Sequence, residues 1–356
     1  MVSKVLMYGN TAIAEAAIRA GCQCYFGYPI TPQNELTEYM AAHLGPKKGC
    51  AFVQAESEVA AINMVHGAAA AGVRVMTSSS SPGISLKQEG ISYIAACQLP
   101  AVIVNMSRGG PGLGSIIAAQ SDYFQSTRGG GHGDYRTIVL APASVQELAD
   151  LTHKAFDLTD KYRVPVMILG DGMLGQMMEP VEFKHEAPAV PPVRSDGLRG
   201  AKGRSSKIVK TFTSNPVELE EINWSLFRRY QLIKNNETTF ESFMTEDAEM
   251  IVVAFGISAR IAKGAIKSAR AKGQKVGMIR PISLWPFPYD AIKQAAQTIK
   301  SFLVFEMSMG QMVEDVQFAV EGGADVEFYG RPGGVIPTPS EFARVISRNY
   351  VQKGLK

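Results

Sequence analysis

The stretch FGYPITPQNELTEYM, residues 26–40, joins the end of an apolar strand to an amphipathic helix. Proline fixes its own φ and pushes the preceding residue towards extended geometry, so Ile30 and Thr31 cannot begin the helix. One interpretation is a tight connection with Pro32 at the first helical position. The other is that the two prolines hold the Thr31 hydroxyl in a defined pose for binding. The order strand, turn and helix is the unit that the rest of the chain repeats.

Short apolar runs and segments with helical period alternate along residues 1–180. The runs that predict strands are KVLMY (4–8), CYFGY (24–28), AFVQ (51–54), RVMTSS (74–79), AVIVNMS (101–107), TIVLAP (137–142) and VPVMILG (164–170). This alternation predicts right-handed βαβ crossovers and a doubly wound parallel sheet covered on both faces. The expected fold class is therefore α/β, with a first domain over residues 1–180.

Residues 181–246 interrupt this alternation. The segment begins rich in proline, glycine and charge, and only NWSLFRRYQLIK within it has a helical pattern, so we expect a linker or excursion. Strand patterns then resume as MIVVAFG (250–256), KVGMIRP (275–281), SFLVFEM (301–307) and VEFYG (326–330). They predict a second, smaller α/β domain over residues 247–356.

Composition excludes several classes of protein. The chain has 356 residues, of which 46% are hydrophobic, and a formal net charge of +3, which indicates a soluble globular protein with no nucleic-acid partner. The first residues lack the features of a secretion signal, and no segment is long and apolar enough to span a membrane, so we expect a cytoplasmic location. Cys22, Cys24, Cys50 and Cys97 show no CxxC spacing, which predicts buried thiols and no metal site in this chain.

Residues capable of chemistry follow four successive predicted strands. They are Thr31 in the PITP turn, Glu56 after AFVQ, the TSSSSPG run at 77–83, and Arg108 at the start of RGGPGLG. The carboxyl ends of parallel strands meet at one edge of a sheet, where ligands bind, so these residues should converge there.

Each of these residues also has a purely structural interpretation. Glu56 or Glu58 could open a helix because the helix dipole favours an acid there. The serine run could be a polar loop that caps a helix, and Arg108 could lie on the surface. The glycines after Arg108 lack the G-x-G-x-x-G spacing, which disfavours a nicotinamide-dependent dehydrogenase.

The segment LGDGMLG, residues 169–175, contains the GDG that opens the magnesium-diphosphate motif of thiamine enzymes. That motif also needs an asparagine some two to three dozen residues later, but the next asparagine is Asn215. Asp171 is therefore expected to cap the exit of a strand and not to bind a metal ion.

Taken together, YPITP, QAESE, TSSSSPG, MSRGGPGLG and QSDYFQSTRGGGHGD (120–134) resemble, in order and spacing, the α-type subunit of 2-oxoacid:ferredoxin oxidoreductases. The resemblance is strongest to the branched-chain, 2-oxoisovalerate branch, with 2-oxoglutarate and pyruvate as alternative substrates. It implies a pyrimidine-type thiamine-diphosphate-binding domain at 1–180 and a transketolase-C-terminal-like domain at 247–356. The alternative from another class is a non-catalytic nucleotide-binding module with the glycine-rich loop at a phosphate.

The resemblance implies an active site divided between subunits. Thiamine diphosphate would lie between this chain and a diphosphate-domain β-type subunit, which would carry Mg²⁺, and 4Fe–4S clusters would lie on γ-type and ferredoxin-like partner subunits. Coenzyme A and ferredoxin would take the acyl group and the electrons.

The same resemblance assigns roles to individual residues. Glu56 would hydrogen-bond the N1′ atom of the cofactor's aminopyrimidine ring and act as an acid–base group through it. The substrate carboxylate would be held by Thr31 and Arg108. The remaining cofactor contacts would come from Pro29, Ser79 and Ser80. A second carboxylate, as in 2-oxoglutarate, needs its own cation, for which Arg128, His132 and Arg136 all remain open.

Overall fold

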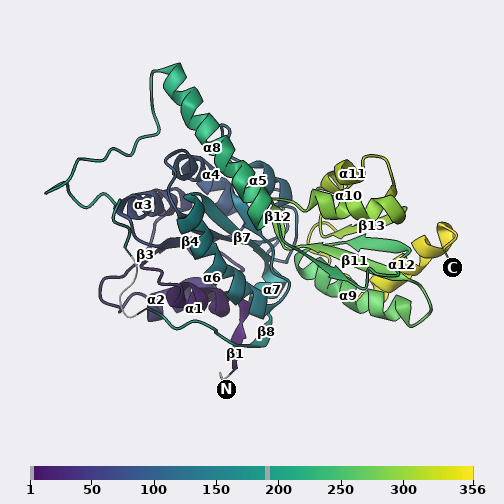
Figure 1. Ribbon diagram of the computed structural model, residues 1–356. Helices are drawn as coiled ribbons and strands as arrows, with labels where there is room; N and C mark the ends of the chain where they lie inside the picture. Colours follow the sequence, from purple (N-terminus) through teal and green to yellow (C-terminus); the bar gives the residue numbers. More distant parts are fainter. Residues whose placement is uncertain (1–3, 189–192, 356) are drawn as a thin grey trace.

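The computed structural model describes residues 4–188 and 193–355 and shows two α/β bodies side by side (Figure 1). The first is built on a seven-stranded sheet, in which every neighbouring pair is parallel except the one at the β12 edge. In spatial order its strands are β12 (Ser283–Trp285), β6 (Ile138–Leu140), β7 (Pro165–Asp171), β5 (Ala101–Ser107), β4 (Val75–Ser79), β2 (Cys24–Gly27) and β3 (Ala51–Gln54). The predicted α/β class and parallel sheet are confirmed.

Helices cover both faces of this sheet. On one face α1 packs against α2 and α6, and on the other α3 packs against α4. The helices of this body are α1 (Gly9–Arg19), α2 (Asn34–His43), α3 (Glu58–Ala71), α4 (Ser81–Ala96), α5 (Tyr123–Arg128), α6 (Val145–Tyr162) and α7 (Gly172–Gln176). Because both faces are covered, every residue of β5 and β7 is buried, which explains why these strands read as continuous apolar runs.

The first predicted strand lies outside the parallel sheet. KVLMY does form β1 (Val5–Tyr8), but it pairs antiparallel with β8 (Met178–Val181) as a separate two-stranded sheet. Val5 and Leu6 remain exposed, so this strand contributes little to the core. Its apolar pattern alone could not distinguish this short ribbon from a strand of the main sheet.

The second body contains a five-stranded sheet, parallel except for β9. In spatial order its strands are β14 (Asp325–Gly330), β13 (Ser301–Glu306), β10 (Met250–Val253), β11 (Val276–Pro281) and β9 (Phe240–Phe243). Its helices are α9 (Gly256–Arg270), α10 (Tyr289–Thr298), α11 (Met312–Val320) and α12 (Pro339–Gln352). Here β9 comes from the expected linker, whereas β12 comes from the expected second domain and joins the first sheet. The expected boundaries at residues 180 and 247 therefore assign these two antiparallel edge strands differently from their pairing in the sheets.

The segment at 181–246 contains a long helix, α8 (Pro216–Glu237), which Figure 1 shows extending along the first body. The Asn215 side chain accepts a hydrogen bond from the Val217 N–H and begins the helix, with Pro216 in the first turn. The helix is longer than the pattern NWSLFRRYQLIK predicted. Among residues 4–188 and 193–355, no helix is long and apolar enough to cross a bilayer.

Candidate functional site

The four loops singled out from the sequence meet at one edge of the first sheet. The carboxyl ends of these parallel strands are aligned, because Gly27 of β2 pairs with Gln54 of β3, and Ser79 of β4 pairs with Asn105 of β5. The PITP turn, the Glu56 segment, the serine run and the Arg108 loop each follow one of these strand ends. The expected convergence at the carboxyl edge is confirmed.

The PITP turn is not the start of the helix. The helix α2 begins at Asn34, and Pro32 lies before it, so the interpretation with Pro32 at the first helical position is wrong. The Pro32 carbonyl instead accepts a hydrogen bond of 2.7 Å from Asn10 Nδ2 and one of 3.2 Å from Gln176 Nε2. These bonds tie the turn to α1 and α7 and leave the Thr31 side chain exposed.

Arg108 is a buried cation with an unsatisfied donor. Only 6% of its surface is exposed. Its Nη1 donates to the Thr31 carbonyl at 2.8 Å and its Nη2 donates to the Leu113 carbonyl at 3.2 Å, while Nε has no partner. Among the described residues no carboxylate forms an ion pair with it. Since burying an unpaired charge is costly, this guanidinium is suited to receive an anion next to Thr31.

The serine run provides buried hydroxyl groups at the same edge. Ser79 and Ser80 are fully buried, and neither hydroxyl has a hydrogen-bond partner. Ser80 precedes α4, but its side chain makes no capping bond, so the capping interpretation does not account for it. Ser81 does have partners, because it accepts from the Arg108 N–H and donates to Asp122. Unpaired buried hydroxyls are uncommon in proteins, and at this edge they are able to bind a ligand.

The two glutamates after β3 lie in different environments. Glu56 is exposed and lies outside the helix, whereas Glu58 is the first residue of α3 and only 6% exposed. The Ser57 side chain caps the helix by accepting from the Ala60 N–H. Glu58 lies against Gly83, where an added Cβ atom would come 2.5 Å from its Oε1. The carboxyl group at the buried edge is thus that of Glu58.

Two buried ionisable residues beside this edge escaped the sequence analysis. Lys87 on α4 is fully buried, and this burial lowers its pKa to about 7, although the Glu58 carboxylate acts in the opposite direction. Asp122 accepts hydrogen bonds from Ser81 and Asn105, and burial raises its pKa despite them. The only signal for Lys87 was its position among the apolar and small residues of the α4 pattern.

Arg136 lies near the amino ends of the strands, whereas Arg108 follows the carboxyl end of β5. Arg136 precedes β6, whose first residue Ile138 pairs with Val166, and Val166 pairs with Val102 of β5. From Val102 the strand runs six residues to Arg108, about 20 Å at a rise of roughly 3.3 Å per residue.

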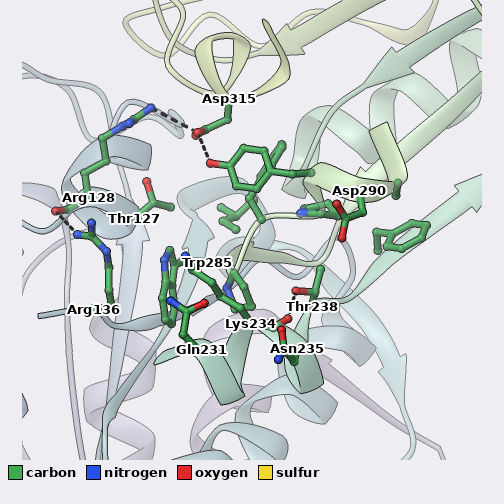
Figure 2. Close-up of a pocket in the computed structure, with 17 residues that line it drawn as sticks. Thr127, Arg128, Arg136, Gln231, Lys234, Asn235, Thr238, Trp285, Asp290 and Asp315 are labelled. Atoms are coloured by element: carbon green, nitrogen blue, oxygen red, sulfur yellow. Dashed lines mark hydrogen bonds and ion pairs between the residues drawn. The ribbon is translucent and has the colours of Figure 1, made fainter. Parts of the chain in front are cut away.

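Arg128 and Arg136 instead line a separate cavity of about 710 Å³ between α8 and the segment after β12 (Figure 2). There Arg128 contacts Asp315 at 3.5 Å, and Arg136 donates to the Arg128 carbonyl at 3.3 Å. The His132 ring packs edge-on against Tyr93 near the end of α4, with 6.2 Å between ring centroids. The side-chain contacts of Arg128, Arg136 and His132 described here are thus with residues other than Thr31 and Arg108.

The GDG segment has the structural role that its sequence suggested. Asp171 ends β7, and its side chain accepts from the Met173 and Leu174 N–H groups at 3.0 Å, which caps α7. Burial raises its pKa to about 6.

The four cysteines form no disulfide, and no cluster of metal-ligating side chains is found among residues 4–188 and 193–355. Cys22 is buried, while Cys24, Cys50 and Cys97 are partly buried, so the expectation of buried thiols holds fully only for Cys22.

Comparison with known proteins shows the family to which this chain belongs. The family model described as pyruvate flavodoxin/ferredoxin oxidoreductase, thiamine diphosphate-binding, matches residues 15–237, and that of pyruvate:ferredoxin oxidoreductase core domain II matches residues 248–342. The chain belongs to the α-type subunits of the 2-oxoacid:ferredoxin oxidoreductases. It is similar to the ketoisovalerate oxidoreductase subunit VorB of Methanothermobacter marburgensis, with 53% identity covering 92% of this chain and 93% of the relative. The 2-oxoglutarate synthase subunit KorA of Methanothermobacter thermautotrophicus is 38% identical, covering 97% of this chain and 99% of the relative.

A solved structure supports the same family, and a second one shares the fold. The 2-oxoglutarate:ferredoxin oxidoreductase from Magnetococcus marinus, with 2-oxoglutarate, coenzyme A and succinyl-CoA bound, matches with a TM-score of 0.82 and 26% identity over 98% of this chain. This chain spans 65% of that longer chain. A split-gene transketolase, with a TM-score of 0.58 and 16% identity over 98% of both chains, shares the fold.

The carboxyl edge of this α-type subunit has hydroxyl and carboxyl groups that could bind the aminopyrimidine ring of thiamine diphosphate. The hydroxyls of Ser79 and Ser80 are buried without partners, and the Glu58 carboxyl group lies near that of Ser79, next to Gly83. The aminopyrimidine ring presents polar nitrogens that such groups can bind. The residues present therefore fit the pyrimidine half of the cofactor.

Proposed function

We propose that this chain supplies the substrate-binding and pyrimidine-binding half of an enzyme that oxidatively decarboxylates 2-oxoisovalerate with coenzyme A. The observation that carries the proposal is the buried Arg108 guanidinium, which lacks a carboxylate partner in the described part of the chain and donates to the backbone carbonyl of Thr31. Every 2-oxoacid presents a carboxylate, and a guanidinium with a nearby hydroxyl is a suitable receptor for it. The family relationship favours this enzymatic role over a nucleotide-binding module.

Each residue at the edge has a distinct task in this proposal. Arg108 and the Thr31 hydroxyl hold the substrate carboxylate. The hydroxyls of Ser79 and Ser80, together with Pro29 at the start of the turn, hold the pyrimidine ring. When bound, thiamine diphosphate supplies a carbon nucleophile for the substrate carbonyl.

Glu58 is better placed than Glu56 to hold a proton at the N1′ atom of that ring. A proton-transfer group works best where water is excluded and its geometry is fixed, and Glu58 is buried against Gly83. Glu56 is exposed at the end of the strand. We therefore transfer the role expected for Glu56 to its neighbour in the helix.

The remaining half of the active site is proposed to come from partner subunits. The relatives are named as subunits, which supports a multi-subunit assembly. A β-type subunit would supply the diphosphate-binding domain with Mg²⁺, and γ-type and ferredoxin-like subunits would carry the 4Fe–4S clusters and pass electrons to ferredoxin. The four free thiols of this chain support a reducing, cytoplasmic location.

The reconstituted complex should prefer 2-oxoisovalerate to 2-oxoglutarate. A second carboxylate needs a second cation, and Arg128 and Arg136 line a separate cavity beside α8. We expect kcat/KM to be at least about tenfold higher for 2-oxoisovalerate, since an unpaired carboxylate in the pocket costs more than about 1.4 kcal/mol. The measurement is reduction of a viologen dye with 2-oxoisovalerate, 2-oxoglutarate and pyruvate in turn. A preference for 2-oxoglutarate would place the chain with the synthase relatives.

The chain purified alone should be colourless and inactive. Its four cysteines lack cluster-binding spacing, and its GDG segment caps a helix. We expect no absorbance near ~400 nm and no acid-labile sulfide, because four thiolates normally hold such a cluster. Activity should appear only on mixing with the β-type subunit. An iron–sulfur spectrum from the isolated chain would refute the proposed division of cofactors.

A further inference from the structure

The segment QSDYF, residues 120–124, connects the second body to the carboxyl edge of the first sheet. Gln120 is only 3% exposed, and its backbone N–H donates to the Met307 carbonyl at 2.9 Å while its Oε1 accepts from the Met307 N–H at 3.0 Å. The same side chain donates to the Phe255 carbonyl at 2.9 Å and accepts from the Ser258 hydroxyl at 2.6 Å. Met307 follows β13 and Phe255 precedes α9, so the start of the segment is fixed to two elements of the second body.

The rest of the segment is fixed to α11 and to the residue before it. Gln311 precedes α11, and its Nε2 donates to the Ser121 carbonyl at 2.7 Å while its Oε1 accepts from the Phe124 N–H at 2.8 Å. The fully buried Tyr123 donates from its hydroxyl to Asp315 of α11 at 2.6 Å. These bonds hold the backbone on both sides of the residue that follows Ser121, so the side chain of that residue is presented in a fixed direction.

That residue is Asp122, whose side chain turns to the first sheet. Its Oδ2 accepts from the Ser81 hydroxyl at 2.6 Å and from Asn105 Nδ2 at 2.9 Å. The Ser81 oxygen in turn accepts from the Arg108 N–H at 3.0 Å. A hydroxyl has one proton, which could instead be donated to the Arg108 carbonyl, 3.2 Å away. The shorter bond to the carboxyl group keeps this proton on the Asp122 side and leaves the lone pairs of Ser81 for the Arg108 N–H.

We propose that Asp122 and Gln311 are positioning residues for the reaction, through which the second body holds Arg108 in the pose that receives the substrate carboxylate. Gln311 fixes the backbone around Asp122, and the Asp122 carboxyl group acts on Arg108 through the Ser81 hydroxyl. This inference rests on the proposed role of Arg108. The fork of a guanidinium binds a carboxylate best when two parallel hydrogen bonds can form, and a small displacement of such a binding group lowers the rate steeply.

The first test is hydrogen exchange of the Arg108 backbone amide in the full-length chain, measured by NMR. This amide donates to Ser81, so its protection reports the contact itself. We expect Asp122→Ala and Gln311→Met each to speed its exchange at least about tenfold, because the loss of a supporting hydrogen bond favours local opening. Gln317→Met makes the same chemical change as Gln311→Met on the exposed face of α11, and it should leave this exchange rate unchanged.

The second test is kinetic and uses the reconstituted complex. Asp122→Ala and Gln311→Met should lower kcat/KM about tenfold for 2-oxoisovalerate, 2-oxoglutarate and pyruvate alike, since each acid presents the same carboxylate. Exchange of the C2 proton of bound thiamine diphosphate should be unchanged, because it involves no substrate. In the Arg108→Met background neither change should cause a further loss, since both act through Arg108. A purely structural role would instead reduce C2 exchange and kcat/KM together.

The outcomes separate this inference from the proposed function. An unchanged exchange rate of the Arg108 amide in Gln311→Met, which keeps the length of the side chain, would overturn the inference even if Asp122→Ala folds poorly. Faster amide exchange with undiminished kcat/KM would overturn it as well, and so would a loss that persists in the Arg108→Met background. Wild-type kcat/KM in Arg108→Met itself would instead refute the proposed role of Arg108 in binding the carboxylate.

Discussion

Glu58→Gln in the reconstituted complex is expected to slow exchange of the C2 proton of bound thiamine diphosphate by at least about a hundredfold. Glutamine has nearly the same size as glutamate and can still form a hydrogen bond, but it cannot accept and return a proton. Glu58 is only 6% exposed, and its carboxyl group lies against Gly83 beside the unpaired Ser79 hydroxyl. The measurement is deuterium exchange at C2 followed by acid quench and NMR of the released cofactor.

The matched control is Glu56→Gln, which makes the same chemical change two residues earlier. Glu56 is exposed, so its loss should change the exchange rate by less than about twofold, as is usual for surface substitutions. The opposite result, with a slow Glu56 variant and a normal Glu58 variant, would return the catalytic role to Glu56. Cofactor affinity should be measured for both variants, because a weakened site could mimic slow exchange.

The sequence located this edge of the sheet but could not distinguish these two carboxylates. Alternating strand and helix patterns place residues 55–58 at the end of a strand, and a polar cluster at such an end is a reliable signal in parallel sheets. Which of two acids points inward depends on the backbone of the intervening connection, where neither periodicity applies. The structure decides it by starting α3 at Glu58 after the Ser57 cap.

The region between the domains was harder to predict for a different reason. The pair Asn215-Pro216, which is typical of a helix N-terminus, was present in the sequence. However, α8 carries exposed apolar side chains, among them Val217, Trp224 and Phe227, so its apolar residues do not follow a regular amphipathic period. The edge strands β9 and β12 are only four and three residues long, too short for a pattern. Their pairing depends on contacts with strands distant in the sequence, which local sequence patterns do not reveal.

Lys87 shows a further limit of sequence patterns. A lysine in a helix usually lies on the solvated face, and its place between Gly83 and Gly90 becomes meaningful only when α3 is seen packed against that face. Arg108, by contrast, was found from the sequence because it follows a strand end directly.

Arg108→Met is expected to lower kcat/KM at least about a hundredfold for 2-oxoisovalerate, 2-oxoglutarate and pyruvate alike. A hydrogen bond to a charged acceptor is worth roughly 1.5 to 3 kcal/mol, and this change removes the cation as well as the donors. Thr31→Val, which keeps volume and β-branching, should cost about ten- to a hundredfold. Because both groups act on one carboxylate, the double variant should lose less than the sum of the single losses. Thr31→Val with wild-type kinetics would leave the PITP segment as a turn only.

Stability separates binding from a purely structural role of Arg108. Its guanidinium bonds to the Thr31 and Leu113 carbonyls and so joins two loops, but it is also a buried charge without an ion-pair partner in the described part of the chain. Removing a buried charge that has no ion-pair partner recovers its desolvation cost, which offsets the loss of the two hydrogen bonds. We therefore expect the Tm of Arg108→Met to stay unchanged or rise while kcat/KM falls, with Arg108→Lys intermediate because it keeps the charge and loses the fork of donors. A fall in Tm that parallels the fall in activity would mean that Arg108 mainly holds the loops, and the substrate carboxylate would then need another receptor.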